Sequence, residues 1–92
     1  MDMSIEIFTI VSRDDCSGCD RAKELISRHG HHYNEVNVPK SLSREEFFDL
    51  VNKHNTTKTV PKIFLGSKLI GGYEDLAEWY DNQASGFGDG QL

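Results

Sequence analysis

The stretch that decides the fold reads IEIFTIVSRDDCSGC and covers residues 5–19. Its first half is a β-branched and aromatic run, typical of a strand buried on both faces of a sheet. Its second half holds the only two cysteines of the chain, Cys16 and Cys19, in a Cys-X-X-Cys unit. Apolar residues then recur at helical spacing over residues 22–29, and Gly30 is a helix stop. We therefore expect a strand, a turn with the cysteines, and a helix that begins at them.

The remaining apolar patterns predict a strand over residues 33–38, a helix over 43–54, two antiparallel strands over 63–70 and a last helix from residue 73. Ser43 and Glu46 form a capping box, and Gly66 leads a two-residue type II′ turn. Because the first strand-helix-strand unit is a right-handed crossover, the sheet should be mixed, with helices on both faces. The predicted fold is an α/β sandwich in the order βαβαββα.

Composition narrows the class of protein. The 92 residues fit one compact domain, and 37% hydrophobic with 27% charged residues excludes disorder, collagen and coiled coil. The net charge of −5, with scattered basic residues, argues against a nucleic-acid partner. No run fits a membrane span or a signal sequence, so we expect a cytoplasmic monomer. The domain should cover residues 1–83, and residues 84–92, which lack an apolar period, should form a flexible glycine-rich tail.

The spacing of the cysteines suits redox chemistry. At the start of a helix, unpaired backbone N–H groups and the helix dipole stabilise a thiolate, which makes Cys16 the candidate nucleophile. Cys19, one turn later, could resolve a mixed disulfide formed on Cys16. Two other interpretations of the Cys-X-X-Cys unit are half of a zinc site and a pair of small residues without chemical function. The spacing of the four histidines does not fit a zinc finger, so we assign them to packing and solvation and expect no metal ligand.

These features together resemble the glutaredoxin family over about residues 4–83. The resemblance rests on three motifs in order: Arg13 with the Cys16 to Cys19 unit, then Thr59-Val60-Pro61, then Gly71-Gly72-Tyr73-Glu74-Asp75. It implies a thioredoxin-like fold with a four-stranded mixed sheet and three helices. The single strand before the cysteines is also similar to glutaredoxins rather than to the longer thioredoxins.

The resemblance further implies a glutathione site. Pro61 would be cis and lie beside the active cysteine, leaving the backbone of Val60 free to pair with the substrate. Arg13 would meet the glycyl carboxylate of glutathione. The start of the last helix would hold the γ-glutamyl end. The residues assigned to glutathione are thus Arg13, Thr59, Val60, Pro61, Gly72, Glu74 and Asp75, with weaker assignments for Lys53 and Lys58.

Some positions depart from the family pattern. Ser17 and Gly18 replace the common Pro-Tyr between the cysteines, which predicts a looser loop. Asp14 and Asp15 precede Cys16, where like charge disfavours a thiolate. We expect Arg13, Arg21 and Lys23 to offset them. Val11 stands where many relatives have an aromatic residue.

The expected function is glutathione-dependent reduction of protein disulfides or protein-glutathione mixed disulfides through Cys16 and Cys19. Because relatives with a small residue at the Ser17 position can hold a [2Fe-2S] cluster with glutathione, cluster binding is one alternative. A dedicated electron donor to one enzyme, such as ribonucleotide reductase, is another. For such a partner, the acidic chain favours a basic docking face.

Overall fold

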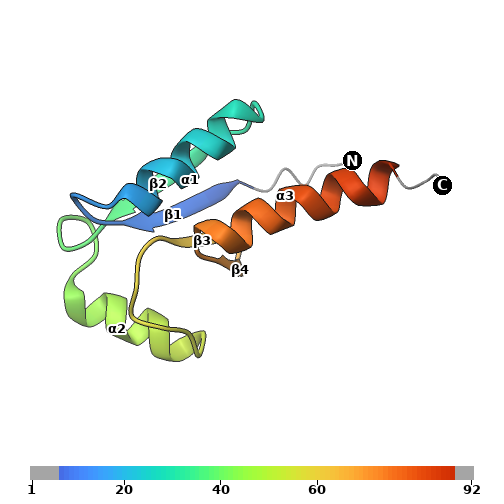
Figure 1. Ribbon diagram of the computed structural model, residues 1–92. Helices are drawn as coiled ribbons and strands as arrows, with labels where there is room; N and C mark the ends of the chain where they lie inside the picture. Colours follow the sequence, from blue (N-terminus) through green and yellow to red (C-terminus); the bar gives the residue numbers. More distant parts are fainter. Residues whose placement is uncertain (1–6, 89–92) are drawn as a thin grey trace.

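The computed structural model describes residues 7–88 and has the predicted order of elements (Figure 1). They are β1 (Phe8–Ser12), α1 (Ser17–Arg28), β2 (Tyr33–Asn37), α2 (Arg44–Lys53), β3 (Lys62–Leu65), β4 (Lys68–Gly71) and α3 (Tyr73–Gly88). Among the helices of residues 7–88, none has the length and apolar character needed to cross a membrane.

One mixed sheet forms the middle of the molecule, with strand order β2-β1-β3-β4. Strand β1 pairs in parallel with β2 and antiparallel with β3, and β3 pairs antiparallel with β4. Ile10 lies between Glu35 on β2 and Ile63 on β3. The chain therefore makes one crossover through α1 and one hairpin, as the sequence predicted.

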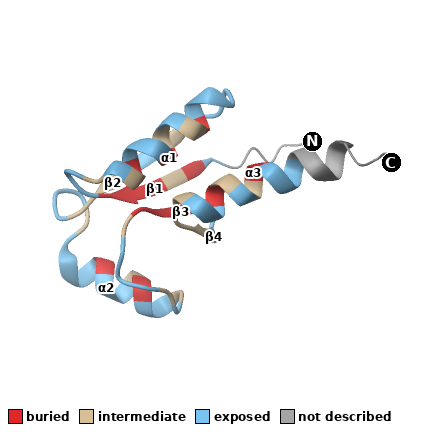
Figure 2. Cartoon of the chain, viewed as in Figure 1, coloured by how far each residue is buried: buried red, intermediate tan, exposed pale blue. Residues whose placement is uncertain are grey.

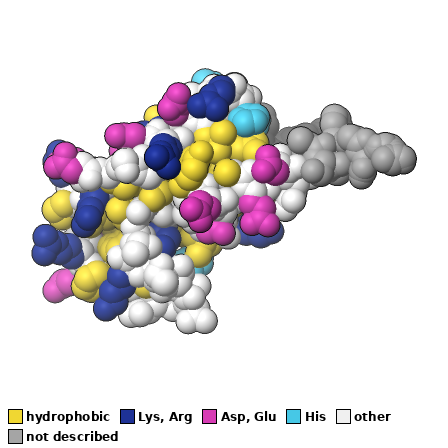
Figure 3. Space-filling view, viewed as in Figure 1, with side chains coloured by type: hydrophobic (Ala, Val, Ile, Leu, Met, Phe, Trp, Pro, Cys, Tyr) yellow, Lys and Arg dark blue, Asp and Glu magenta, His cyan; other side chains and the backbone are white. Residues whose placement is uncertain are grey.

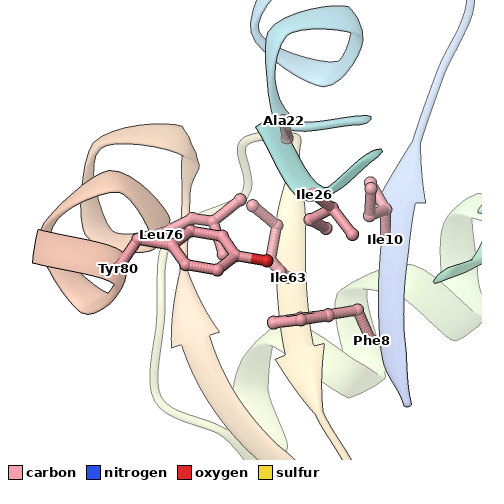
Figure 4. Close-up of a cluster of buried hydrophobic side chains, with 7 residues drawn as sticks. All are labelled: Phe8, Ile10, Ala22, Ile26, Ile63, Leu76 and Tyr80. Carbon is pink, nitrogen blue, oxygen red and sulfur yellow. The ribbon is translucent and has the colours of Figure 1, made fainter. Parts of the chain in front are cut away.

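The two faces of the sheet carry separate apolar clusters. Helices α1 and α3 cover one face, where their buried side chains meet those of β1 and β3 (Figure 4). That cluster consists of Phe8, Ile10, Ala22, Ile26, Ile63, Leu76 and Tyr80. Helix α2 covers the other face, where Phe47 and Val51 pack with Val11 and Phe64. The layers are thus helices, sheet and helix, the predicted sandwich.

Helix α2 turns only a narrow stripe to the sheet. Ser43 caps it, because its hydroxyl accepts from the Glu46 N–H at 3.0 Å while the Glu46 carboxylate accepts from the Ser43 N–H at 2.9 Å. Phe47 and Val51 are its buried residues, and most of the helix surface is exposed (Figure 2). The predicted capping box is confirmed, and local capping is important for a helix that packs over so small an area.

The histidines at the end of α1 pack as expected. The His29 ring stacks on Tyr80 with centroids 3.8 Å apart, and His31 Nδ1 lies 2.8 Å from the Tyr80 hydroxyl. These contacts join the C-terminus of α1 to α3, and burial raises the pKa of the Tyr80 phenol.

Several boundaries differ from the sequence prediction, most of them by one residue. Strand β1 begins at Phe8, since Ile7 lies outside the ladder and is 48% exposed, while residues 5 and 6 lie outside the described part. Strand β2 ends at Asn37 rather than residue 38. Helix α3 continues to Gly88, into the expected tail, because no proline interrupts its backbone hydrogen bonds. The predicted turn is present, with Gly66 at a φ of 61°.

Replacing Ile63 by Ala should lower the free energy of unfolding by about 2–5 kcal/mol, because its fully buried side chain joins β3 to both α1 and α3. The exposed Ile7 provides a matched control, and Ile7→Ala should change the free energy of unfolding by about 0.5 kcal/mol or less. Urea unfolding of the reduced chain measures both. Equal losses would contradict this placement of the core.

Candidate active site

The cysteines lie at the start of α1, as the sequence predicted. Cys16 is the N-cap residue, and its Sγ accepts from the Cys19 N–H at 3.1 Å. The two cysteines form a disulfide with Cα atoms 5.2 Å apart. Cys16 is partly exposed, whereas Cys19 is 1% exposed and belongs to the core. A partner therefore reaches Cys16 from solvent, while Cys19 is reached through Cys16.

Pro61 joins three elements at this site. A Cβ on Gly18 in α1 would lie 3.3 Å from Pro61 Cδ, and one on Gly72 would lie 3.7 Å from the Pro61 carbonyl oxygen. Pro61 is buried and directly precedes β3, and the Val60–Pro61 bond is cis, as the resemblance implied. A second cis bond, Val38–Pro39, was not predicted. The segment between the cysteines therefore lies close to Pro61 at Gly18.

A groove of about 790 Å³ opens beside Cys16. One side is the loop after β1 together with the segment that leads to Pro61, which contributes Lys58, Thr59 and Val60. The other side is the loop after β2 and the first turns of α2, with Pro39, Arg44 and Phe48. Cys16 thus lies in a groove between the body of the molecule and α2.

The structure divides the predicted glutathione residues into two groups. Arg13, Thr59 and Val60 line the groove with Cys16, and Lys58 lines it too. Glu74 and Asp75 lie in the first turn of α3, and Gly72, directly before this helix, lies close to the Pro61 carbonyl. Lys53 is the exposed last residue of α2 and is not one of the lining residues.

Glu74 and Asp75 occupy the first turn of α3, as expected from the helix dipole. The Asp75 carboxylate accepts from the Gly72 N–H at 3.0 Å, which fixes the start of the helix. A Cβ on Gly71 would clash with that same carboxylate, and Gly71 has a φ of 130°, so glycine is required there. The Gly71-Gly72 pair therefore lets Asp75 fold back over the turn.

The acidic residues before Cys16 are held differently from the prediction. Asp14 pairs with Lys40 at 3.3 Å and accepts from the Asn37 amide at 3.2 Å. The hydrogen bond from the Lys40 ammonium, with that from Asn37, lowers the pKa of the Asp14 carboxyl. Asp15 is exposed and has a φ of 56°, a conformation that aspartate tolerates better than most residues.

The expected cations mostly have other roles. Lys23 pairs with Glu35 at 2.7 Å, and Glu35 also accepts from the buried Ser12 hydroxyl at 2.6 Å. These bonds lower the pKa of Glu35 and raise that of Lys23. Arg21 lies 5.9 Å from the centroid of the Tyr73 ring. The ion-pair partner of Asp14 is thus Lys40, which the sequence did not predict, while the charge of Lys23 adds to the lowering of the Asp14 pKa, as expected.

Lys62, directly after Pro61, was missed by the sequence analysis. It is 4% exposed, and its Nζ donates to the hydroxyls of Thr57 and Thr59 at 3.1 and 3.0 Å. Within residues 7–88 no carboxylate lies within ion-pair distance of the Lys62 ammonium. Burial therefore lowers the pKa of Lys62. The negative charge of Asp75 offsets part of this lowering. Because Thr59 lines the groove, this ammonium fixes part of the groove wall.

Lys62→Met should raise the free energy of unfolding at pH 7, by on the order of 1 kcal/mol, because it removes a buried charge without a carboxylate partner. In the native chain the folded-state pKa lies below the unfolded value of 10.5. Between these two pKa values the unfolded state binds more protons than the folded state. The free energy of unfolding of the wild type therefore rises with pH in this range because of Lys62. The advantage of the Met variant should therefore shrink toward pH 10.5 in parallel denaturant titrations. A constant difference would contradict the buried charge.

The fold and the dithiol define the class of protein. A four-stranded mixed sheet, three helices and a Cys-X-X-Cys disulfide at the N-terminus of α1 are those of a thioredoxin-like thiol-disulfide oxidoreductase. Comparison with known proteins gives the family. Residues 5–70 match the family profile described as Glutaredoxin, and the chain belongs to the glutaredoxin family.

Individual relatives agree with this assignment. The chain is 33% identical to glutaredoxin 3 of Escherichia coli over 73 residues, which cover 79% of this chain and 81% of that protein. It is 34% identical to glutaredoxin 1 of Rickettsia prowazekii over 73 residues, or 79% of this chain and 73% of that one.

Solved structures show the same fold. Glutaredoxin 1 from Francisella tularensis, crystallised with cacodylate, superposes with a TM-score of 0.74 at 25% identity over 88% of this chain and 99% of that one. The buckwheat glutaredoxin-glutathione complex has a TM-score of 0.76 at 24% identity, covering 85% of this chain and 71% of that one.

Proposed function

We propose that this oxidoreductase is driven by glutathione and acts on protein-glutathione mixed disulfides and protein disulfides. The observation that carries the proposal is the accessible Cys16 sulfur in a groove with Arg13, Thr59 and Val60, backed by the buried Cys19. The family as a whole uses glutathione, and a structural relative was solved as a glutathione complex. Glutathione keeps the cytoplasm reducing, and we place the protein there as a monomer.

On a mixed disulfide, Cys16 does the chemistry alone. Its thiolate attacks the glutathione sulfur, forms a disulfide with it, and releases the protein as a thiolate that takes up a proton. The thiolate of a second glutathione then attacks the bound one and leaves as glutathione disulfide, which restores the Cys16 thiolate. The N–H of Cys19, already directed at Cys16 Sγ, would stabilise this anion.

On a protein disulfide, Cys19 takes part. Cys16 attacks one substrate sulfur and the other leaves as a thiolate. The Cys19 thiolate then attacks Cys16, frees the second substrate sulfur and closes the Cys16–Cys19 disulfide seen in this structure. Two glutathione molecules reduce that disulfide and leave as glutathione disulfide.

Glutathione would lie across Pro61, between the two groups of predicted residues. The Arg13 guanidinium, at the rim of the groove, offers a donor to the glycyl carboxylate. The backbone of Val60, between Thr59 and Pro61, would pair with the cysteinyl unit. The N-terminus of α3, with Gly72, Glu74 and Asp75, would hold the γ-glutamyl end, whose ammonium suits these carboxylates.

Cys16→Ser should abolish the glutathione-coupled reduction of a small glutathionylated substrate, lowering the rate roughly a hundredfold or more, because the nucleophile is lost. Cys19→Ser should keep most of that activity but lose the reduction of protein disulfides. Both follow from NADPH oxidation with glutathione and glutathione reductase. Loss of both activities in the Cys19 variant would contradict this division of labour.

The same assay separates the alternatives. A wild-type chain that is inactive with glutathione but active with a thioredoxin reductase would overturn the proposal. A glutathione-ligated [2Fe-2S] cluster, which Ser17 allows, would be held by the Cys16 thiolate of the reduced chain together with glutathione. Visible absorbance after anaerobic reconstitution would reveal it. Ribonucleotide reductase remains a predicted protein substrate, to be tested by supplying it with electrons through this chain.

Arg13→Gln should raise the KM for the glutathionylated substrate roughly three- to tenfold and change kcat less, because it removes a charge-assisted contact to a part of glutathione that does not react. Arg28→Gln is the control, since Arg28 pairs with Glu24 on the outside of α1. Steady-state kinetics at fixed ionic strength measure the effect. Equal KM values for the two variants would remove Arg13 from the site.

A further inference from the structure

The groove is larger than the part assigned to glutathione. Beyond Thr59 and Val60 it continues to α2, which contributes Arg44 and Phe48. Lys58 stands between the two parts, with its Nζ 4.8 Å from the centroid of the Phe48 ring. We call Arg44, Phe48 and Lys58 the outer wall of the groove.

The side chains of the outer wall carry positive charge although the chain carries −5. The acidic residues of α2, Glu45, Glu46 and Asp49, are exposed but do not line the groove. The groove is lined by Arg13, Arg44 and Lys58 against Asp14 and Asp15, and Asp14 is already paired with Lys40. In Figure 3, Lys and Arg side chains at the end of the molecule that carries α2 are interspersed with acidic ones, whereas acidic side chains predominate over α3. Because salt screens charges beyond about 8–10 Å, a segment in the groove experiences this local charge rather than the total.

Phe48 gives the outer wall an apolar contact. It is 41% exposed because it lies beside the stripe of α2 that Phe47 and Val51 turn to the sheet. Its ring borders the groove, with the Lys58 ammonium over it. An exposed aromatic ring beside a cation is suited to anchor an apolar side chain whose neighbours are acidic.

We propose that the outer wall binds the polypeptide segment around the substrate cysteine and selects segments that are acidic with an apolar residue beside the cysteine. This rests on the proposed function, whose substrate class it specifies. It reverses the expectation from net charge, which favoured a basic partner. Glutathione would occupy the part of the groove near Arg13 and Val60, and the acidic segment would run along α2 past Arg44.

Two glutathionylated hexapeptides test this. Both hold a central glutathionylated cysteine between two leucines, and they differ only in three glutamates or three lysines. Wild type should show a kcat/KM roughly fivefold higher for the acidic peptide at low salt, with the ratio falling as salt rises. In Arg44→Glu the ratio should fall to one or below. An added acid at the N-terminus of α2 favours the helix, so this variant should fold.

The ratio is compared within each variant, so changes common to both peptides cancel. Arg28→Glu makes the same change in charge on the outside of α1 and should keep the wild-type ratio. Phe48→Ala should lower kcat/KM for both peptides and leave the ratio intact. A wild-type ratio near one, or an equal fall in the Arg28 and Arg44 variants, would overturn the proposal.

Binding without chemistry separates this proposal from the proposed function. The Cys16→Ser chain is titrated by NMR with the same two peptides lacking glutathione. The acidic peptide should bind more tightly and shift the resonances of Arg44 and Phe48. Equal affinities, or shifts elsewhere, would overturn the docking surface even if the glutathione assay succeeded. Selective binding with an inactive wild type would instead keep the surface and reject glutathione as reductant.

Discussion

The contact of Pro61 with two helix starts holds the site together. Pro61 lies close to Gly18 near the start of α1 and to Gly72 before α3, since a Cβ on these glycines would lie 3.3 and 3.7 Å from Pro61 atoms. Cys16, the N-cap residue of α1, therefore lines the groove together with Val60. Since β3 begins directly after Pro61, the central sheet carries this junction. Cys16, the backbone of Val60 and the N-terminus of α3 are therefore fixed relative to one another.

The sequence predicted what depends on local pattern and on motif order. Ser43 with Glu46 marked the capping box, Gly66 marked the hairpin turn, and the Cys16 unit marked the start of α1; all three are confirmed. The three glutaredoxin motifs gave the fold and family, which the comparisons bear out. These features can be predicted from the sequence because each depends only on neighbouring residues or on a known spacing of motifs.

What the sequence missed depends on contacts between distant residues. Lys40 pairs with Asp14 across the loops after β2 and β1, and Lys62 is buried because the strand register places it beside Val11. Neither could be deduced without the sheet. Phe48 could have been noticed, since it falls outside the apolar spacing of Phe47, Leu50 and Val51 and so predicts an exposed aromatic ring.

The central claim is that Cys16 is the sulfur that exchanges with glutathione, while Cys19 is shielded behind it. The most direct measurement is the intact mass of the folded Cys19→Ser and Cys16→Ser chains after brief exposure to glutathione disulfide at pH 7. The account predicts one added glutathionyl group on Cys16 in the first chain and little on the buried Cys19 in the second. Equal labelling of the two chains, or labelling of Cys19 alone, would contradict it.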